Sequence, residues 1–167
     1  MNILNNLSRI NKFIFIKSNL YFLLLIIIIF SLDRVTKNIV IKNFIDNIFY
    51  FNDFINLDLI WNIGIGFGLL SFDSLLIYNL ITALIGLVII ILFYIVVISS
   101  TLDKLIFSII IGGALGNLYD RLLYKAVPDF IDLHYNTFHW FTFNVADIFI
   151  TLGVLAMILK EFFVKNK

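Results

Sequence analysis

Residues 74–102 read SLLIYNLITALIGLVIIILFYIVVISSTL and form a stretch of 29 residues without one charged side chain. A helix needs about 20 predominantly apolar residues to cross the hydrocarbon core of a bilayer. This stretch therefore predicts one helix that spans a membrane unaided. Three further uncharged runs are shorter than a span: 15 residues in 18–32, 15 in 105–119 and 12 in 148–159. If these runs also cross, they carry charged residues into the bilayer with them.

The composition indicates a membrane protein throughout. Of the 167 residues 62% are hydrophobic, and the mean hydropathy is +1.05, whereas about half of a soluble domain is apolar. We expect one domain over residues 1–167, an all-α integral membrane protein with four transmembrane helices. The formal net charge of +1 argues against the basic surface of a nucleic-acid-binding protein. The absence of cysteine excludes disulfides, thiolate metal sites and a cysteine nucleophile.

The charged residues predict how the helices are oriented. The first apolar run ends in FSLDRVTK at residues 30–37, which offers no small-residue cleavage site. We therefore expect an uncleaved first span and cytoplasmic termini, with 7 Lys and Arg inside and 5 outside, in weak agreement with the positive-inside rule. Charges at membrane depth normally face one another or a wet cavity. A shared polar site near the outer face is thus predicted from the charges that gather there: Asp33, Lys37, Asp120, Arg121 and Asp147.

Two segments connect the spans at this outer face. Residues 43–72 contain alternating patches such as NLDLIWN and predict a small sheet or hairpin. Residues 124–141 predict a short second connection, in which we interpret Asp132 as an exposed turn aspartate. His134 and His139 suggest a metal site with Asp129, but their spacing matches no standard zinc pattern. We therefore interpret both histidines as interfacial or solvated.

The motif GGALGNLYDRL at residues 112–122 can be interpreted in two ways. Asn117 and Asp120 share a helix face with glycines, at the spacing of three and four residues that brings side chains together. Small residues on such a face favour close helix packing, with Asp120 and Arg121 as a surface pair. Alternatively, the face carries a polar site, or Asp120 and Arg121 tie this helix to the outer segment.

A second motif, FNVADIFIT at residues 143–151, places a carboxylate at the start of an apolar run. Asn144 and Asp147 lie on one polar stripe of the predicted helix. Asp and Asn are both favoured as helix caps, so Asp147 is one candidate for the cap. If Thr142 or Asn144 is the cap instead, Asp147 lies inside the helix and needs another explanation.

Five short blocks, in this order, give the chain a family resemblance. They are DRVTK from Asp33, NIGIGFG from Asn62, GGALGNLYDR from Gly112, VPDF from Val127 and FNVAD from Phe143. Together they resemble lipoprotein signal peptidase, also called signal peptidase II. The third and fifth blocks are highly specific, and the others are weak alone. The chain departs from the family pattern at residue 34, where arginine replaces the usual glutamine and puts a substrate-binding role of that side chain in doubt.

The resemblance implies an aspartic endopeptidase that works within the membrane, with Asp129 and Asp147 as the catalytic pair. Its substrate would be a bacterial prolipoprotein with a diacylglyceryl-modified cysteine, cut just before that cysteine. We expect a monomer in the inner membrane, in contact with lipid, with no cofactor and no metal. The residues expected to support the pair or bind substrate are Asp33, Lys37, Asn62, Gly64, Asn117, Asp120, Arg121 and Asn144.

Two other classes of protein also place Asp and Arg inside membranes. A small transporter or channel subunit uses such residues as an ion path, but here the charges collect at one end only. A structural membrane subunit uses them to hold helices together. Prolipoprotein processing separates the peptidase from both.

Overall fold

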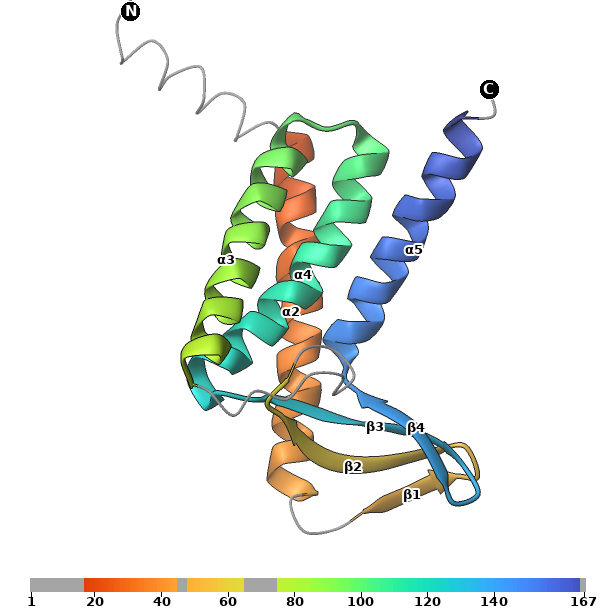
Figure 1. Cartoon of the computed structure of the whole chain (residues 1–167). Helices are drawn as coiled ribbons and strands as arrows, with labels where there is room; N and C mark the ends of the chain where they lie inside the picture. Colours follow the sequence, from red (N-terminus) through yellow and green to blue (C-terminus); the bar gives the residue numbers. More distant parts are fainter. Residues whose placement is uncertain (1–16, 45–47, 65–74, 166–167) are drawn as a thin grey trace, which may run out of the picture.

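The computed structural model describes residues 17–44, 48–64 and 75–165 of the chain. Within these residues there are four helices and four strands (Figure 1). The helices are α2 (Lys17–Asn43), α3 (Leu75–Ile98), α4 (Thr101–Tyr124) and α5 (Val145–Lys165). The strands are β1 (Phe49–Asn52), β2 (Ile55–Asn62), β3 (Val127–Tyr135) and β4 (Phe138–Phe143).

The four helices form a bundle in which α4 contacts the other three. The start of α2, the end of α5 and the α3–α4 connection lie at the end of the bundle opposite the sheet (Figure 1). Glycines of α4 permit close approach of its neighbours. A Cβ on Gly113 would lie 2.5 Å from the carbonyl oxygen of Ala146, and a Cβ on Gly116 would collide with the Asp33 carboxylate. These glycines therefore have the predicted packing role, and Gly116 packs directly against a residue of the polar site.

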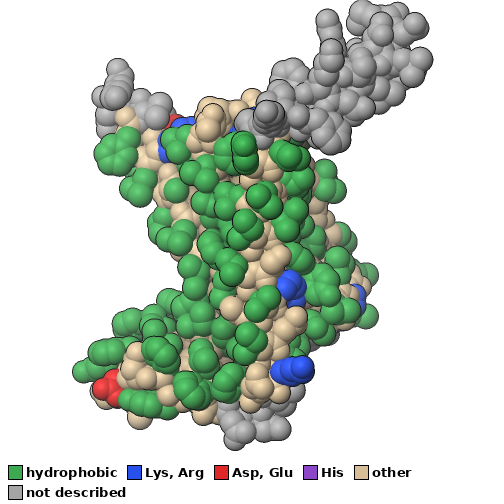
Figure 2. Space-filling view, turned by 180° about the vertical axis from the view of Figure 1, so that it is seen from behind, with side chains coloured by type: hydrophobic (Ala, Val, Ile, Leu, Met, Phe, Trp, Pro, Cys, Tyr) green, Lys and Arg blue, Asp and Glu red, His purple; other side chains and the backbone are tan. Residues whose placement is uncertain are grey.

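Two of the helices, α3 and α4, are long and apolar enough to cross a membrane, among the residues that the structure describes. The outward faces of α2 and α5 are also apolar. Exposed large hydrophobic side chains on these two helices include Leu20, Leu24, Ile28, Leu152, Leu159 and Phe163. Figure 2 shows hydrophobic side chains covering the bundle on the face turned away from the viewer of Figure 1. A soluble protein would not expose an apolar surface of this extent.

The four strands form one antiparallel sheet in the order β1-β2-β3-β4, placed across one end of the bundle (Figure 1). The hairpin β1–β2 confirms the sheet predicted in residues 43–72; residues 45–47 and 65–72 of that segment lie outside the described residues. The connection predicted over residues 124–141 lies between α4 and α5, and β3 and β4 form a second hairpin within it that the sequence did not predict. β3 pairs with both β2 and β4, so an all-α description omits the sheet that carries part of the site.

Candidate active site

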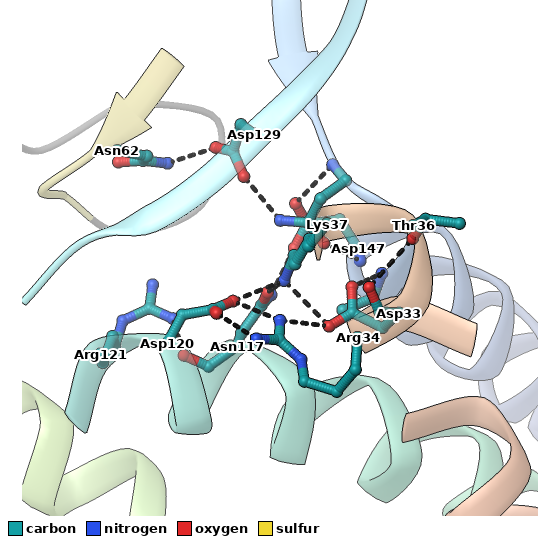
Figure 3. Close-up of polar contacts among 12 residues, drawn as sticks. Asp33, Arg34, Thr36, Lys37, Asn62, Asn117, Asp120, Arg121, Asp129 and Asp147 are labelled. Atoms are coloured by element: carbon teal, nitrogen blue, oxygen red, sulfur yellow. Dashed lines mark hydrogen bonds and ion pairs between the residues drawn. The ribbon is translucent and has the colours of Figure 1, made fainter. Parts of the chain in front are cut away.

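The polar site lies where the bundle meets the sheet, and several elements contribute to it (Figure 3). β3 provides Asp129 and the first turn of α5 provides Asp147. α2 and α4 provide charged and amide side chains around them. The predicted gathering of charged residues at one end of the helices is therefore present.

α5 begins with a reciprocal cap between Asn144 and Asp147. The backbone N–H of Asp147 donates to Asn144 Oδ1 at 3.1 Å, and the backbone N–H of Asn144 donates to Asp147 Oδ2 at 3.3 Å. This is the geometry of a capping box, with Asn144 as the cap and an acid at the third helical position. Asp147 therefore lies inside the first turn. Its other oxygen, Oδ1, accepts a 2.7 Å hydrogen bond from Asn117 Nδ2.

Asp129 is the third residue of β3 and is only 3% exposed. Its oxygens accept hydrogen bonds from two amides, Asn62 Nδ2 at 2.8 Å and Asn144 Nδ2 at 2.5 Å. These amides favour the ionised carboxylate, but burial opposes it more strongly. Burial, followed by the nearby charge of Asp147, raises the pKa of Asp129 from 3.8 to about 6. Asp129 therefore holds a proton much more readily than an exposed aspartate does.

Asn144 joins the two acids directly. Its side-chain amide donates to Asp129, and its backbone N–H donates to Asp147. Two carboxylates that accept from the same residue lie close together. This proximity is also why the charge of Asp147 raises the pKa of Asp129. At such proximity one shared proton is more favourable than two negative charges.

Beside this pair lies a buried cluster of two acids and two bases. Asp120 accepts from Lys37 Nζ at 2.7 Å and from the two terminal nitrogens of Arg34 at 2.5 and 2.8 Å. Asp33 accepts from Arg34 at 2.8 Å and lies 3.0 Å from Lys37 Nζ. The side chains of Asp33, Lys37 and Asp120 are fully buried. The formal charges balance, which buried ions require, and the cluster joins α2 to α4.

The charged cluster connects to Asp147 through a single amide. Lys37 Nζ donates to Asn117 Oδ1 at 2.8 Å, and Asn117 Nδ2 donates to Asp147. The lysine thereby fixes which end of the amide faces the acid, because an amide cannot donate through its oxygen. Asp33 adds a second connection, since its Oδ1 accepts the backbone N–H of Ala146 in the first turn of α5 at 3.0 Å.

Arg121 joins α4 to Gly64, just beyond the end of β2, rather than pairing with its neighbour Asp120. Its guanidinium donates to the carbonyl oxygens of Asn117 at 3.2 Å and Gly64 at 3.3 Å. The N–H of Gly64 in turn donates to Asn62 Oδ1 at 2.8 Å. Asp120 and Arg121 are both buried, so the interpretation of this dipeptide as a surface pair was wrong. The alternative, a tie between this helix and the outer segment, describes Arg121.

The interpretation of Asp132 as an exposed turn residue was also wrong. Asp132 lies in the middle of β3 and is buried, as is His134. Asp132 Oδ2 lies 2.8 Å from Nδ1 of His139, on the neighbouring strand. His139 is exposed, as expected of an interfacial or solvated histidine, whereas His134 is buried. Both histidines lie beside Asp132 rather than Asp129.

Comparison with known proteins assigns this arrangement to a family. The family model described as signal peptidase (SPase) II matches residues 25–163, which includes every residue of the site. The chain belongs to the signal peptidase II family. It is 51% identical over 150 residues to the lipoprotein signal peptidase of Pelagibacter ubique (strain HTCC1062), covering 87% of this chain and 89% of that one. The protein of that name from Aquifex aeolicus (strain VF5) is 44% identical over 140 residues, with coverage of 82% and 83%.

A solved structure agrees with the assignment of the fold. A bacterial membrane enzyme determined by the in meso method at 2.3 Å resolution superposes with a TM-score of 0.73 at 30% identity. The match covers 88% of this chain and 91% of that one. The chain is thus a member of a membrane protease family, with the same fold as a membrane enzyme.

In this signal peptidase II chain, Arg34 is the site residue that departs from the family pattern. It is a structural ion in the charged cluster, with its guanidinium 4.9 Å from the ring centre of Tyr119. A signal was available in the sequence. An arginine at the end of a predicted span requires an acidic partner, and two of the predicted helices provide one each, Asp33 and Asp120.

Proposed function

We propose that this chain is an aspartic endopeptidase that removes signal peptides from prolipoproteins, with Asp129 and Asp147 as its catalytic pair. The observation that carries the proposal is that Asn144 donates to both carboxylates, which come from different elements. Burial and mutual charge favour one shared proton. Membership of the signal peptidase II family provides the reaction.

Peptide hydrolysis at such a pair needs no other chemical group. The ionised aspartate takes a proton from a water molecule, whose oxygen then forms a bond to the scissile carbonyl carbon. The protonated aspartate donates a hydrogen bond to the carbonyl oxygen and stabilises the tetrahedral intermediate. The proton taken from water passes to the leaving nitrogen as the carbon–nitrogen bond breaks. Because one proton is shared, the pair titrates as a unit.

The surrounding amides act as positioning groups in this mechanism. Asn62 and Asn144 hold the two oxygens of Asp129, and Asn117 holds one oxygen of Asp147. These bonds set the carboxylates in the orientation that both proton transfers need. Arg121 and Asn62 hold Gly64, just beyond the end of β2, and in this mechanism the substrate backbone binds beside it.

Two cavities that reach Asp147 suit a lipid-modified peptide. One of about 260 Å³ lies between β4 and α5, and its apolar lining includes Phe143, Ile148 and Leu152. The other, of about 250 Å³, is lined by polar as well as apolar residues, among them Asn117 and Arg121. The apolar cavity matches an acyl chain or apolar side chain of the substrate, and the mixed cavity matches its backbone. Cleavage just before a diacylglyceryl-modified cysteine is part of the proposal.

The membrane arrangement proposed with this function has four spans, cytoplasmic termini and an extracytoplasmic sheet. Helix lengths of 27, 24, 24 and 21 residues support four spans. The basic residues at both ends of the chain support the orientation. The catalytic pair then lies near the outer face, in a monomer surrounded by lipid. A reporter fused after Lys167 tests the orientation, and extracytoplasmic activity of that fusion would overturn it.

The test of the function is cleavage of a lipid-modified prolipoprotein by the purified protein in detergent. The expected products are a free signal peptide and a lipoprotein that begins with the modified cysteine, identified by mass spectrometry. The same precursor without its diacylglyceryl group is the matched control substrate and should be cleaved poorly. Absence of cleavage of the modified precursor, by protein that remains folded, would contradict the proposed function.

A further inference from the structure

A second cluster of ligating side chains lies on the β3–β4 hairpin, apart from the catalytic pair. Asp132 and His134 belong to β3, and His139 belongs to β4. Asp132 Oδ2 lies 2.8 Å from Nδ1 of His139 and 3.6 Å from Nδ1 of His134. One ligand atom from each residue lies within 4.8 Å of the other two. Nothing in the proposed mechanism uses these three side chains.

The strand geometry explains why the three residues meet. Asp132 and His134 are two apart on one strand, so their side chains point to the same face of the sheet. The β3–β4 register shifts between Leu133, which pairs with Phe141, and His134, which pairs with His139. Without this bulge, Trp140 would stand opposite His134. The irregularity therefore brings a second imidazole to the face that carries Asp132, a common effect of bulges near functional sites.

Two polar atoms at this face have no partner among the described residues. Nδ1 of His134 is buried and makes no hydrogen bond, although the residue is only 7% exposed. It is aimed at Asp132 Oδ2, just beyond hydrogen-bond length. Oδ1 of Asn56 is also buried and unpaired, and Asn56 stands directly opposite Asp132 on β2. Buried polar atoms are normally hydrogen-bonded, because leaving them unsatisfied is costly, and a bound ligand would give these two atoms a partner.

We propose that Asp132, His134 and His139 bind a divalent transition metal of the Zn²⁺ type. Imidazole nitrogen and carboxylate oxygen are ligands that Zn²⁺ accepts, at about 2.0–2.2 Å. In a tetrahedron of that size adjacent ligand atoms are about 3.3 Å apart, between the two separations found here. The metal gives Nδ1 of His134, which has no hydrogen-bond partner, a ligand bond. Because the His139 side chain is 58% exposed, water reaches the metal and completes its shell, with Asn56 Oδ1 beside it.

The metal has a structural role in the hairpin and lies away from the peptidase site. Asp132 is three residues beyond Asp129, about 10 Å along the strand. The odd offset also turns the two side chains to opposite faces of the sheet. A metal bound by both strands fixes the tip of β3–β4, which lies at the far side of the sheet from the bundle (Figure 1). Bound metal should therefore raise stability without taking part in cleavage.

The test is a metal titration of the full-length protein in detergent, purified without a polyhistidine tag and stripped with a chelator. Added Co²⁺ should bind at one equivalent and give the visible absorption of four-coordinate Co²⁺, which one equivalent of Zn²⁺ should abolish. His139→Ala should lower the affinity by more than about tenfold, because even outer-shell partners of metal ligands contribute about 10–100-fold. Since His139 is exposed, this variant is expected to fold.

The matched control is Asp53→Asn, which removes an exposed acid in the β1–β2 hairpin, where Tyr50 is its hydrogen-bond partner. It should bind Co²⁺ as the wild type does. Zn²⁺ should raise the melting temperature of the wild type and of this control, but not that of His139→Ala. Failure of the stripped protein to bind one equivalent of Co²⁺, or equal binding by His139→Ala, would overturn the proposal. Chelator-stripped protein should still cleave prolipoprotein, and rescue of lost cleavage by Zn²⁺ would contradict the structural role.

Discussion

Lys37→Met is the change that tests most sharply how the charged cluster supports the peptidase site. Lys37 Nζ contacts three oxygens, of Asn117, Asp120 and Asp33. Methionine keeps much of the volume of the side chain but has no charge and no donor. After the substitution two buried carboxylates share only Arg34, and the oxygen of Asn117 loses the donor that orients it.

The expected loss of stability is large, because removal of one partner from a buried ion group costs about 3–5 kcal/mol. For a chain of this length that corresponds to a fall in melting temperature of about 6–20 °C. Cleavage should also fall at temperatures at which the variant is folded. The amide of Asn117 can then turn away from Asp147, and the positive charge that favours ionisation of Asp129 is absent.

The assay is thermal unfolding in detergent, followed by cleavage well below the melting temperature. Lys42→Met is the matched control, because Lys42 is an exposed residue later in the same helix. It should melt and cleave as the wild type does. Equal melting temperatures for the two variants would refute the reasoning, since the buried cluster would then contribute no more than an exposed lysine.

Three further predictions concern the neighbours of the catalytic pair. Arg34→Gln, which restores the residue usual in the family, should lower the melting temperature in detergent by less than loss of the lysine does, because Arg34 is partly exposed; an equal or larger fall would contradict this. Gly116→Ala should lower the free energy of unfolding by about 1–3 kcal/mol, measured by the same unfolding, because the new Cβ collides with Asp33. Wild-type stability of this variant would contradict the prediction, since Asp33 could then move aside without loss. The raised pKa of Asp129 means that the folded state binds this proton more tightly than the unfolded state. Relative to Asp129→Asn, the wild type should therefore lose stability as the pH rises from about 4 to above 6, and a difference independent of pH would exclude the shift.

The sequence was most informative where a polar residue interrupts an apolar run. When an uncharged run is too short to span a membrane, the charged residues that flank it enter the bilayer and need partners. Asp33, Lys37 and Asp120 lie together, as this rule requires. The choice of Asn144 as the cap could not be made in advance, because Asn and Asp have nearly equal preference for that position. In the structure, the start of α5 at Val145 and the hydrogen bonds between Asn144 and Asp147 distinguish them.

The sheet was harder to predict because strand pairing depends on partners remote in sequence. Residues 127–135 alternate weakly, and β3 is largely buried between β2 and β4 in the sheet. The burial of Asp132 depends on neighbours remote in sequence, and the meeting of His134 with His139 follows from a one-residue bulge. Neither the sheet order nor the bulge has a signature in this stretch of sequence that local periodicity can detect.

The central claim is that Asp129 and Asp147 act together on the peptide bond, and amide substitution of each tests it most directly. Asparagine keeps the size of aspartate but cannot act as a carboxylate base. Asp129→Asn and Asp147→Asn should each lower kcat for cleavage of a lipid-modified prolipoprotein by at least about 10²–10⁴-fold. Because groups that act as a unit are not additive, the double variant should be little slower than either single one. All three should remain folded in detergent, and Asp53→Asn should cleave as the wild type does. Cleavage by Asp147→Asn at a rate near that of the wild type would leave Asp147 as a helix-capping residue and contradict the account.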